Sequence, residues 1–449
     1  MHSSLEPEKL RSSEPQNPDF SKSLFSSQSR ITFGFSINTW FSPKTRESYS
    51  SVVDSEEFEP EALVESGVAH QKDDSVLEEL YLGSSFNDVN RIEETKATFT
   101  ELCRLSNFTT LVIYLERFAY WPRDLVLMNL KAFAITTGIR TRYLFERMIG
   151  TRDCRDYQLQ NQLSLEDLHK SDLMESGFKN LFKITKILGI TRAIGVKNVG
   201  YELDKDGFKK LTELLLKDCQ DLEYVICTTD GVSVPQIAFP VLQWLRLDNL
   251  DKLKKICRGQ LPEEAFSELK WLELRNLPAL THLWKGPTQL VRLRNLTSLK
   301  LKRCDKLESM LSLSIARDLM QLQRLDVSKC RKMEVLISSE EGDQNEIAST
   351  TTDKIEFPKL KRLYLKRLPS FSAICKAMNG IELLQLNELT LSQLPKLNSF
   401  CNTSDSNYDT IQPLFNKVCF SNLSLFIYLF KFHCSRVSIN FIYYFAIFI

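Results

Sequence analysis

One apolar template recurs seven times between Phe208 and Phe400 and constrains what this 449-residue chain can fold into. The template reads (Phe/Leu)-x-x-Leu-x-x-Leu-x-Leu-x-x-(Cys/Leu)-x-x-Leu-x-x-(apolar). Its second apolar position is leucine in every copy: Leu211, Leu242, Leu269, Leu296, Leu322, Leu360 and Leu386. The steps between these leucines are 31, 27, 27, 26, 38 and 26 residues. A period of this length is typical of a solenoid built from stacked repeats.

The Leu-x-Leu pair inside each template predicts a short strand. Alternation of apolar and outward residues has the period of a strand, whereas apolar residues at three-residue spacing turn the chain around a narrow core. The clearest pairs are Leu245/Leu247, Leu272/Leu274, Leu299/Leu301, Leu325/Val327, Leu363/Leu365 and Leu389/Leu391. No single unit buries its own apolar face, so the units must stack. We therefore expect an α/β leucine-rich-repeat solenoid, a curved horseshoe with a parallel sheet on its concave surface.

The pattern weakens outside these repeats, which predicts a chain of four parts. They are a mostly disordered, Ser-rich segment (1–75), degenerate repeats (76–205), seven regular repeats (206–402), and a partial repeat with a hydrophobic tail (403–449). The first part has no sustained apolar period that could build a core. The second has strand-like phrases LEELYLG, FTTLVI and LKAFAI. Helical pieces are expected there around residues 94–105 and 163–184.

Two further segments leave alternatives open. The polar, acidic insert 338–356 accounts for the 38-residue step and is expected to be a surface loop, with partner contact as the alternative. Residues 423–449 are long enough to cross a bilayer, but Lys431, His433 and Arg436 interrupt them. Only the last 13 residues are uncharged, and a span needs about 20. We therefore favour a protein without a membrane anchor, and a membrane-tethered protein is the alternative.

Cysteine usage indicates packing rather than chemistry. Of the eleven cysteines, Cys219, Cys304 and Cys330 occupy the template slot that leucine fills in other repeats. Free cysteine behaves as a small hydrophobe, so we expect buried, reduced thiols and a cytoplasmic, intracellular setting. The sequence has no C-x-x-C pair, and its five histidines are scattered. We therefore expect no metal site.

Six phrases, in chain order, carry a family resemblance: LEELYLGSSFNDV, LSNFTTLVIYL, PRDLVLMNLKAFAI, GVKNVGYELDKDGFKKL, AFPVLQWLRLDNLDKLKKIC and EFPKLKRLYLKRLPSFSAIC. They resemble the carboxyl-terminal repeats of plant nucleotide-binding, leucine-rich-repeat disease resistance proteins of the coiled-coil class. The similarity covers residues 76–420. It implies intracellular immune sensing, in which the repeats bind a pathogen effector or a guarded host protein and restrain a switch domain.

The nucleotide-binding domain of that family has no counterpart in this sequence. The phosphate-binding motif G-x-x-x-x-G-K-[ST] occurs nowhere, and the nearest look-alike, Gly189–Lys197 (GITRAIGVK), has the wrong spacing. We therefore expect no cofactor and no enzymatic activity. The expected partner is a protein: an effector, a host protein, or a switch domain in trans. A net charge of +1 argues against nucleic acid. A degenerate receptor fragment without independent function is the alternative.

The outward positions of the predicted strands are the candidate protein-binding surface. Two tryptophans in register beside a mostly basic stretch have the composition of interaction hot spots. The predicted residues are Trp244, Arg246, Trp271, Glu273, Arg275, Lys300, Lys302, Arg324, Arg362, Tyr364 and Lys366. In the alternative interpretation the charged side chains are only solvated and the tryptophans pack on aliphatic stems.

Overall fold

A computed structural model describes the central repeats and short strands on either side of them. The described residues are 31–32, 79–82, 109–115, 117–121, 129–138, 160–175, 178–228, 238–259, 264–284, 292–338, 354–376, 380–397, 401–402 and 418–419. Several predicted features lie outside them. These are the helical piece at 94–105, nearly all of the segment 1–75, the interior of the acidic insert, and the tail 423–449.

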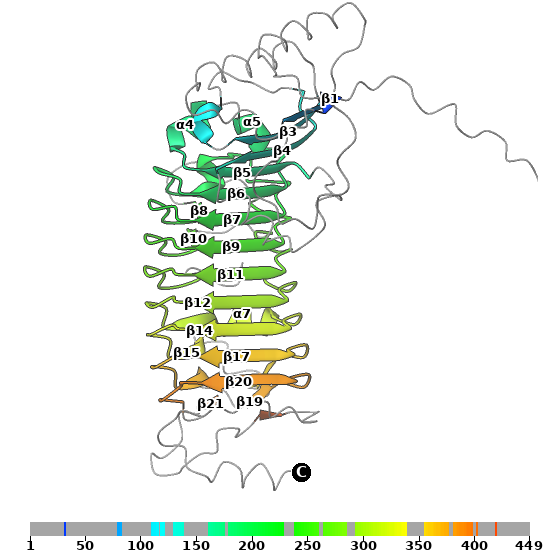
Figure 1. The fold of residues 1–449 in the computed structure, drawn as a ribbon. Coiled ribbons are helices and arrows are strands. Elements are labelled where there is room, and N and C mark those ends of the chain that lie inside the picture. The colour runs from blue at the N-terminus through cyan, green and yellow to red at the C-terminus, as the bar shows by residue number, and fades with distance from the viewer. Residues whose placement is uncertain are drawn as a thin grey trace, which may run out of the picture.

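The described chain is organised around one thirteen-stranded parallel sheet (Figure 1). Its strands, in spatial order, are β1 (Ile31–Thr32), β2 (Glu79–Leu82), β3 (Thr110–Leu115), β4 (Ala132–Thr137), β5 (Gln162–Glu166), β6 (Ile187–Thr191), β7 (Glu213–Lys217), β9 (Trp244–Asp248), β11 (Trp271–Arg275), β12 (Ser298–Lys302), β14 (Arg324–Ser328), β17 (Arg362–Lys366) and β20 (Glu388–Ser392). Spatial order follows chain order, so each turn adds one strand beside the last. The predicted leucine-rich-repeat solenoid is confirmed, with β7 to β20 as the strands of its seven regular repeats.

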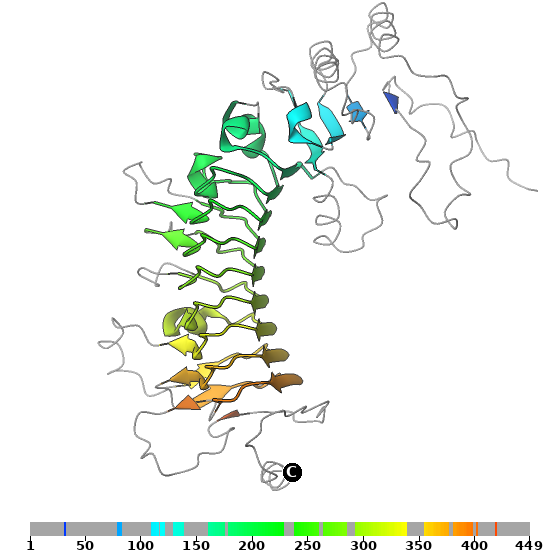
Figure 2. The ribbon, with the colours of Figure 1, turned by 60° about the vertical axis from the view of Figure 1, so that its left-hand side comes forward.

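Shorter strands and helices form the opposite side of the solenoid, and the main sheet lines the inner side of a gentle curve (Figure 2). The short strands are β8 (Ile226–Cys227), β10 (Cys257–Arg258), β13 (Ser309–Ser312), β15 (Val335–Ser338), β16 (Lys354–Glu356), β18 (Ala373–Lys376), β19 (Gly380–Glu382), β21 (Cys401–Asn402) and β22 (Val418–Cys419). The helices are η4 (Phe118–Tyr120), α4 (Lys170–Glu175), α5 (Phe178–Phe182), α6 (Val199–Glu202) and α7 (Leu313–Asp318). Among the described residues, no helix is long and apolar enough to cross a membrane.

The template leucines stack into a continuous core. Leu242, Leu269 and Leu296 are fully buried, each contributed by a successive repeat. A second ladder is aromatic, because the first template position is phenylalanine in three successive repeats. The ring centroids of Phe208 and Phe239 lie 5.4 Å apart and those of Phe239 and Phe266 5.8 Å apart, with nearly parallel planes. Stacking of identical positions thus buries what no single repeat could bury.

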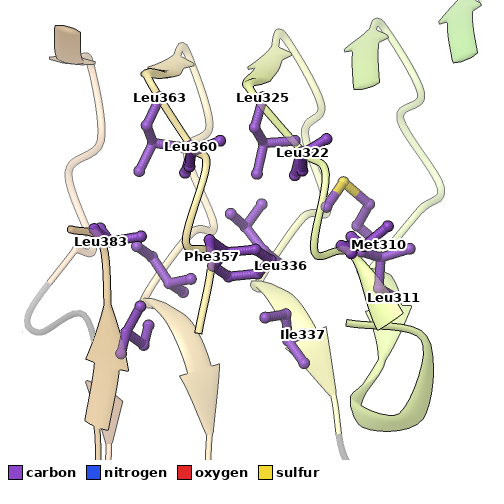
Figure 3. Close-up of a pocket in the computed structure, with 13 residues that line it drawn as sticks. Met310, Leu311, Leu322, Leu325, Leu336, Ile337, Phe357, Leu360, Leu363 and Leu383 are labelled. Carbon is purple, nitrogen blue, oxygen red and sulfur yellow. The ribbon is translucent and has the colours of Figure 1, made fainter. Parts of the chain in front are cut away.

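An apolar void of about 10 Å³ interrupts the core where the 38-residue step falls. Figure 3 shows Leu325 and Leu363 reaching toward it from the main-sheet side, with Leu336 and Phe357 opposite. A space of this size holds at most one water molecule, and its wholly apolar lining offers no hydrogen bond to retain one. The core is therefore packed less completely here than around the phenylalanine ladder.

The cysteine prediction is confirmed for the thiols that the structure describes. Cys219, Cys304 and Cys330 are free and buried in the leucine slot. Burial raises the pKa of the Cys219 thiol to about 11. A thiol with such a pKa is protonated at neutral pH and packs as a small apolar group.

Two local predictions are corrected by the structure. The expected helical piece at 163–184 begins instead as strand β5, and only α4 and α5 within it are helical. The expected loop 338–356 ends in strand β16, which pairs with β19. The short strand β1, which pairs with β2, is compatible with a segment 1–75 that is expected to be mostly disordered. For β5 and β16, backbone pairing with a neighbouring strand overrides a weak local pattern.

Candidate protein-binding surface

The two predicted tryptophans form a stacked pair on the concave sheet. Trp244 opens β9 and Trp271 opens β11, and the strand register pairs them directly. Their ring centroids lie 4.7 Å apart with an angle of 7° between the planes. Adjacent parallel strands are about 4.8 Å apart, so a 27-residue step places identical side chains at stacking distance. Both indoles are partly exposed.

Lys300 extends this pair across the next strand. Its ammonium nitrogen lies 4.7 Å from the centroid of the Trp271 ring, which is a cation–π distance. Partial burial lowers the pKa of Lys300, and the carboxylates of Glu273 and Asp326 oppose that shift. We call Trp244, Trp271 and Lys300 the aromatic stack. It places two partly exposed indoles side by side, with a cation at one end.

Three other predicted residues take part in an ion-pair network beside the stack. Arg246 Nη2 lies 3.0 Å from Asp248 Oδ2, and its Nε lies 3.6 Å from Glu273 Oε2. Arg275 Nε donates to Glu273 Oε1 at 2.9 Å. Asn276 Nδ2 completes the network by donating to Asp248 Oδ1 at 3.1 Å. These three predicted charges are therefore paired within the fold rather than left free for a partner.

A second, more open network involves Arg362. Its guanidinium lies 3.2 Å from Asp326 Oδ1 and 3.4 Å from Glu388 Oε1, and 5.5 Å from the ring centroid of Tyr364. Burial raises the pKa of Asp326, while Arg362 and Lys300 oppose that shift. Asp326 thus lies between two cations on neighbouring strands, yet burial has the larger effect on its titration.

The structure divides the eleven predicted residues into separate groups. The aromatic stack joins three of them, the first network three, and the second network two. Lys302, Arg324 and Lys366 form no ion pair among the residues that the structure describes. In that same part of the chain, no three His, Cys, Asp or Glu side chains gather where they could hold a metal ion.

A row of basic residues that was not among the predicted site residues lies directly after the strands. Arg303 follows β12, Lys329 follows β14 and Arg367 follows β17, each with a positive φ of 57° or 58°. The signal was available in the sequence, because a basic residue recurs immediately after the strand in three successive repeats. These residues lie one position beyond the outward residues around each Leu-x-Leu pair, where the apolar repeat pattern gives no signal.

Comparison with known families places these strands in a wider context. Residues 260–331 match the leucine-rich repeats described as those of RPS2-like plant disease resistance proteins. Within residues 260–331 the repeats are similar to those of this family. The matched residues include β11, β12 and β14, and hence Trp271 and Lys300 of the aromatic stack. Searches of curated proteins and of solved structures gave no significant match.

Proposed function

We propose that this chain is a non-enzymatic, cytoplasmic recognition module of plant defence that binds a pathogen effector or a host protein through its concave sheet. The similarity of residues 260–331 to disease-resistance repeats supports the defence setting. Such repeats generally mediate protein contacts, which supports a protein partner. A switch domain acting in trans is a third kind of protein partner compatible with the same surface.

The aromatic stack is the observation that carries this proposal. Trp244 and Trp271 are held parallel at 4.7 Å by the strand register, and Lys300 caps the outer ring face of Trp271. Tryptophan is enriched among the residues that dominate binding energy. Because stacking already fixes both rings, a partner that covers them does not have to immobilise them, and binding loses little side-chain entropy.

The neighbouring ion-pair network suits the same role. Arg246 and Glu273 are largely buried against each other and against adjacent strands, with only 15% and 9% of their side chains exposed. A partner that covers the stack therefore meets few free charges there that would have to lose water. Such a neutral, ordered surround resembles the ring of weakly contributing contacts that keeps water away from a hot spot.

The test uses the full-length chain as bait for affinity purification from plant tissue, followed by quantitative mass spectrometry. One variant carries Trp244→Ala and Trp271→Ala. A matched control removes two exposed apolar side chains outside the main sheet, through Ile194→Ala and Met320→Ala. Thermal unfolding of each purified bait confirms that the fold is retained.

We expect at least one protein to be captured by the wild type and the control but depleted by about 30-fold or more with the tryptophan variant, as for a hot spot of about 2 kcal/mol. Equal capture by all three baits would contradict recognition through the aromatic stack. Equal loss with the control would point to a general apolar effect and would also contradict it.

A further inference from the structure

Five cations gather along one edge of the main sheet, at the carboxyl ends of three successive strands. Lys302 ends β12 and Lys366 ends β17, while Arg303, Lys329 and Arg367 directly follow β12, β14 and β17. We call these five residues the basic edge. It lies at the opposite ends of the strands from Trp244 and Trp271, which begin β9 and β11.

Backbone hydrogen bonds hold the basic edge in register. Arg303 N donates to Ser328 O at 3.0 Å, Lys329 N to Lys366 O at 2.9 Å, and Arg367 N to Ser392 O at 2.9 Å. Each bond links the residue after one strand to the last residue of the next strand. Consecutive rows of the edge therefore follow the strand spacing of about 4.8 Å.

The positive charge of this edge is not neutralised within the described part of the fold. No carboxylate forms an ion pair with any of the five cations there. The arginines donate instead to neutral amides, Arg303 to Asn276 at 3.4 Å and Arg367 to Gln393 at 2.8 Å. The charge of Arg303 lowers the pKa of Lys329 most, followed by desolvation and then by the other cations of the edge. The cations thus repel one another, and the fold tolerates that repulsion.

Backbone conformation does not account for these residue types. Arg303, Lys329 and Arg367 adopt positive φ, a region in which Asn, Asp and Gly are favoured over long side chains. The equivalent positions after β9 and β11 are indeed Asn249 and Asn276. Arg and Lys at three successive positions of this kind indicate that these residues are present for their charge and not for their fit to the backbone.

We propose that the basic edge binds an acidic helical segment of a protein partner whose carboxylates repeat once per helical turn. The pitch of an α-helix is about 5.4 Å, so one helical turn differs from one strand spacing by less than about 1 Å. Flexible Lys and Arg side chains can bridge that difference. An extended segment repeats its same-face carboxylates about every 6.7 Å and drifts out of step over three rows. The three rows span about 10 Å, which favours a short acidic segment over a long nucleic-acid tract.

This interaction is independent of the aromatic stack, so either can fail while the other holds. The probe is a fluorescein-labelled, alanine-based helical peptide with glutamates at positions i, i+4, i+7 and i+11, which share one face. A matched isomer has the same composition with its glutamates distributed around the helix. Both are titrated against the full-length chain by fluorescence anisotropy at low ionic strength.

The aligned peptide is expected to bind more tightly than its isomer and to be released as salt increases. Lys329→Asn and Arg367→Asn are each expected to weaken binding about two- to fivefold, and together about tenfold. Lys361→Asn is the control, since Lys361 is an exposed cation just before the opposite end of β17 and should leave affinity unchanged. Thermal unfolding of Lys329→Asn, expected at or above the wild-type temperature, separates weakened binding from loss of fold.

Equal affinity for the two peptides would overturn the proposal, as would affinity that ignores the Lys329 and Arg367 substitutions. If Lys361→Asn weakened binding of the aligned peptide equally, net charge alone would explain the affinity, and the proposal would again be overturned. A single-stranded oligonucleotide that binds more tightly than the aligned peptide, with the same sensitivity to Lys329 and Arg367, would reassign the edge to polyphosphate binding.

Discussion

The residue that follows each strand of the regular repeats has a positive φ, with neutral Gln393 after β20, but its chemistry differs between the first three strands and the next three. After β7, β9 and β11 these residues are Asp218, Asn249 and Asn276, and after β12, β14 and β17 they are Arg303, Lys329 and Arg367. The two asparagines of the first set bond to acidic neighbours: Asn249 donates to Asp218 at 2.6 Å and Asn276 to Asp248 at 3.1 Å. The second set forms a row of like charges. One repeat geometry thus serves cohesion in the first half and an open charged surface in the second.

The packing of the core also differs between the two halves. In the first half, three phenylalanines stack in a continuous ladder. In the second, the long step between repeats leaves an apolar void beside Phe357. Atoms that line a void have lost contacts on one side, so the second half is expected to be the less cohesive.

The largest expected effect compares matched phenylalanines in the two halves. Phe239→Ala should lower the free energy of unfolding by about 4 kcal/mol, because the ring is fully buried between Phe208 and Phe266. Phe357→Ala should cost about 1 kcal/mol less, since Phe357 already borders the void. Chemical denaturation of both variants measures the difference. Equal costs, or a larger cost at Phe357, would contradict the packing contrast.

The next effect concerns the two ion-pair networks. Glu273→Ala should destabilise the fold by about 2–3 kcal/mol, because it leaves Arg246 and Arg275 short of their shared carboxylate in a largely buried site. Asp326→Asn should cost less than about 1 kcal/mol, since Arg362 keeps Glu388 as a partner. The comparison is made from denaturation midpoints at neutral pH. The reverse order of costs would show that the second network is the more cohesive.

Exchanging Lys and Asn between two of the positive-φ positions that follow the strands tests whether these residue types determine the difference in stability. Lys329→Asn should raise the free energy of unfolding by up to about 1 kcal/mol, because it relieves both backbone strain and cation repulsion. Asn249→Lys should lower it by about 1 kcal/mol, through strain and loss of the bond to Asp218. Melting temperatures of the two variants provide the measurement. Destabilisation by Lys329→Asn would mean that the lysine has a structural role.

The smallest expected effect is a pH dependence of Asp326. Burial raises the pKa of this carboxyl in the fold, so the folded state binds its proton more tightly than the unfolded chain does. Its contribution to stability is therefore complete below the unfolded pKa and is lost as pH rises through the raised folded value. The wild type therefore loses this contribution on going from acid to neutral pH, and Asp326→Asn does not. The stability of Asp326→Asn minus that of wild type should accordingly be greater at neutral pH than in acid. The opposite trend in denaturation curves across the acid range would show that pairing with Arg362 outweighs burial.

The repeat strands and the stacking of Trp244 on Trp271 could be predicted from the sequence, because a fixed step and Leu-x-Leu pairs determine register. Strands β5 and β6 were missed because burial does not alternate along them: Glu166 is buried with its leucine neighbours, and every residue of β6 is buried. Mutual neutralisation of Arg246 and Glu273 could not be predicted, since it depends on the rotamers of side chains from adjacent strands. The basic edge lies outside the Leu-x-Leu window, so only the strand ends reveal it.

Affinity measurement with a captured partner tests recognition by the aromatic stack most directly. The purified partner would be titrated by calorimetry against the full-length chain, the Trp244→Ala/Trp271→Ala variant, and the Lys329→Asn/Arg367→Asn variant. Our account predicts that the tryptophan variant loses about 30-fold or more in affinity, whatever the basic-edge variant does. Wild-type affinity in the tryptophan variant would contradict it and would place recognition elsewhere on the solenoid.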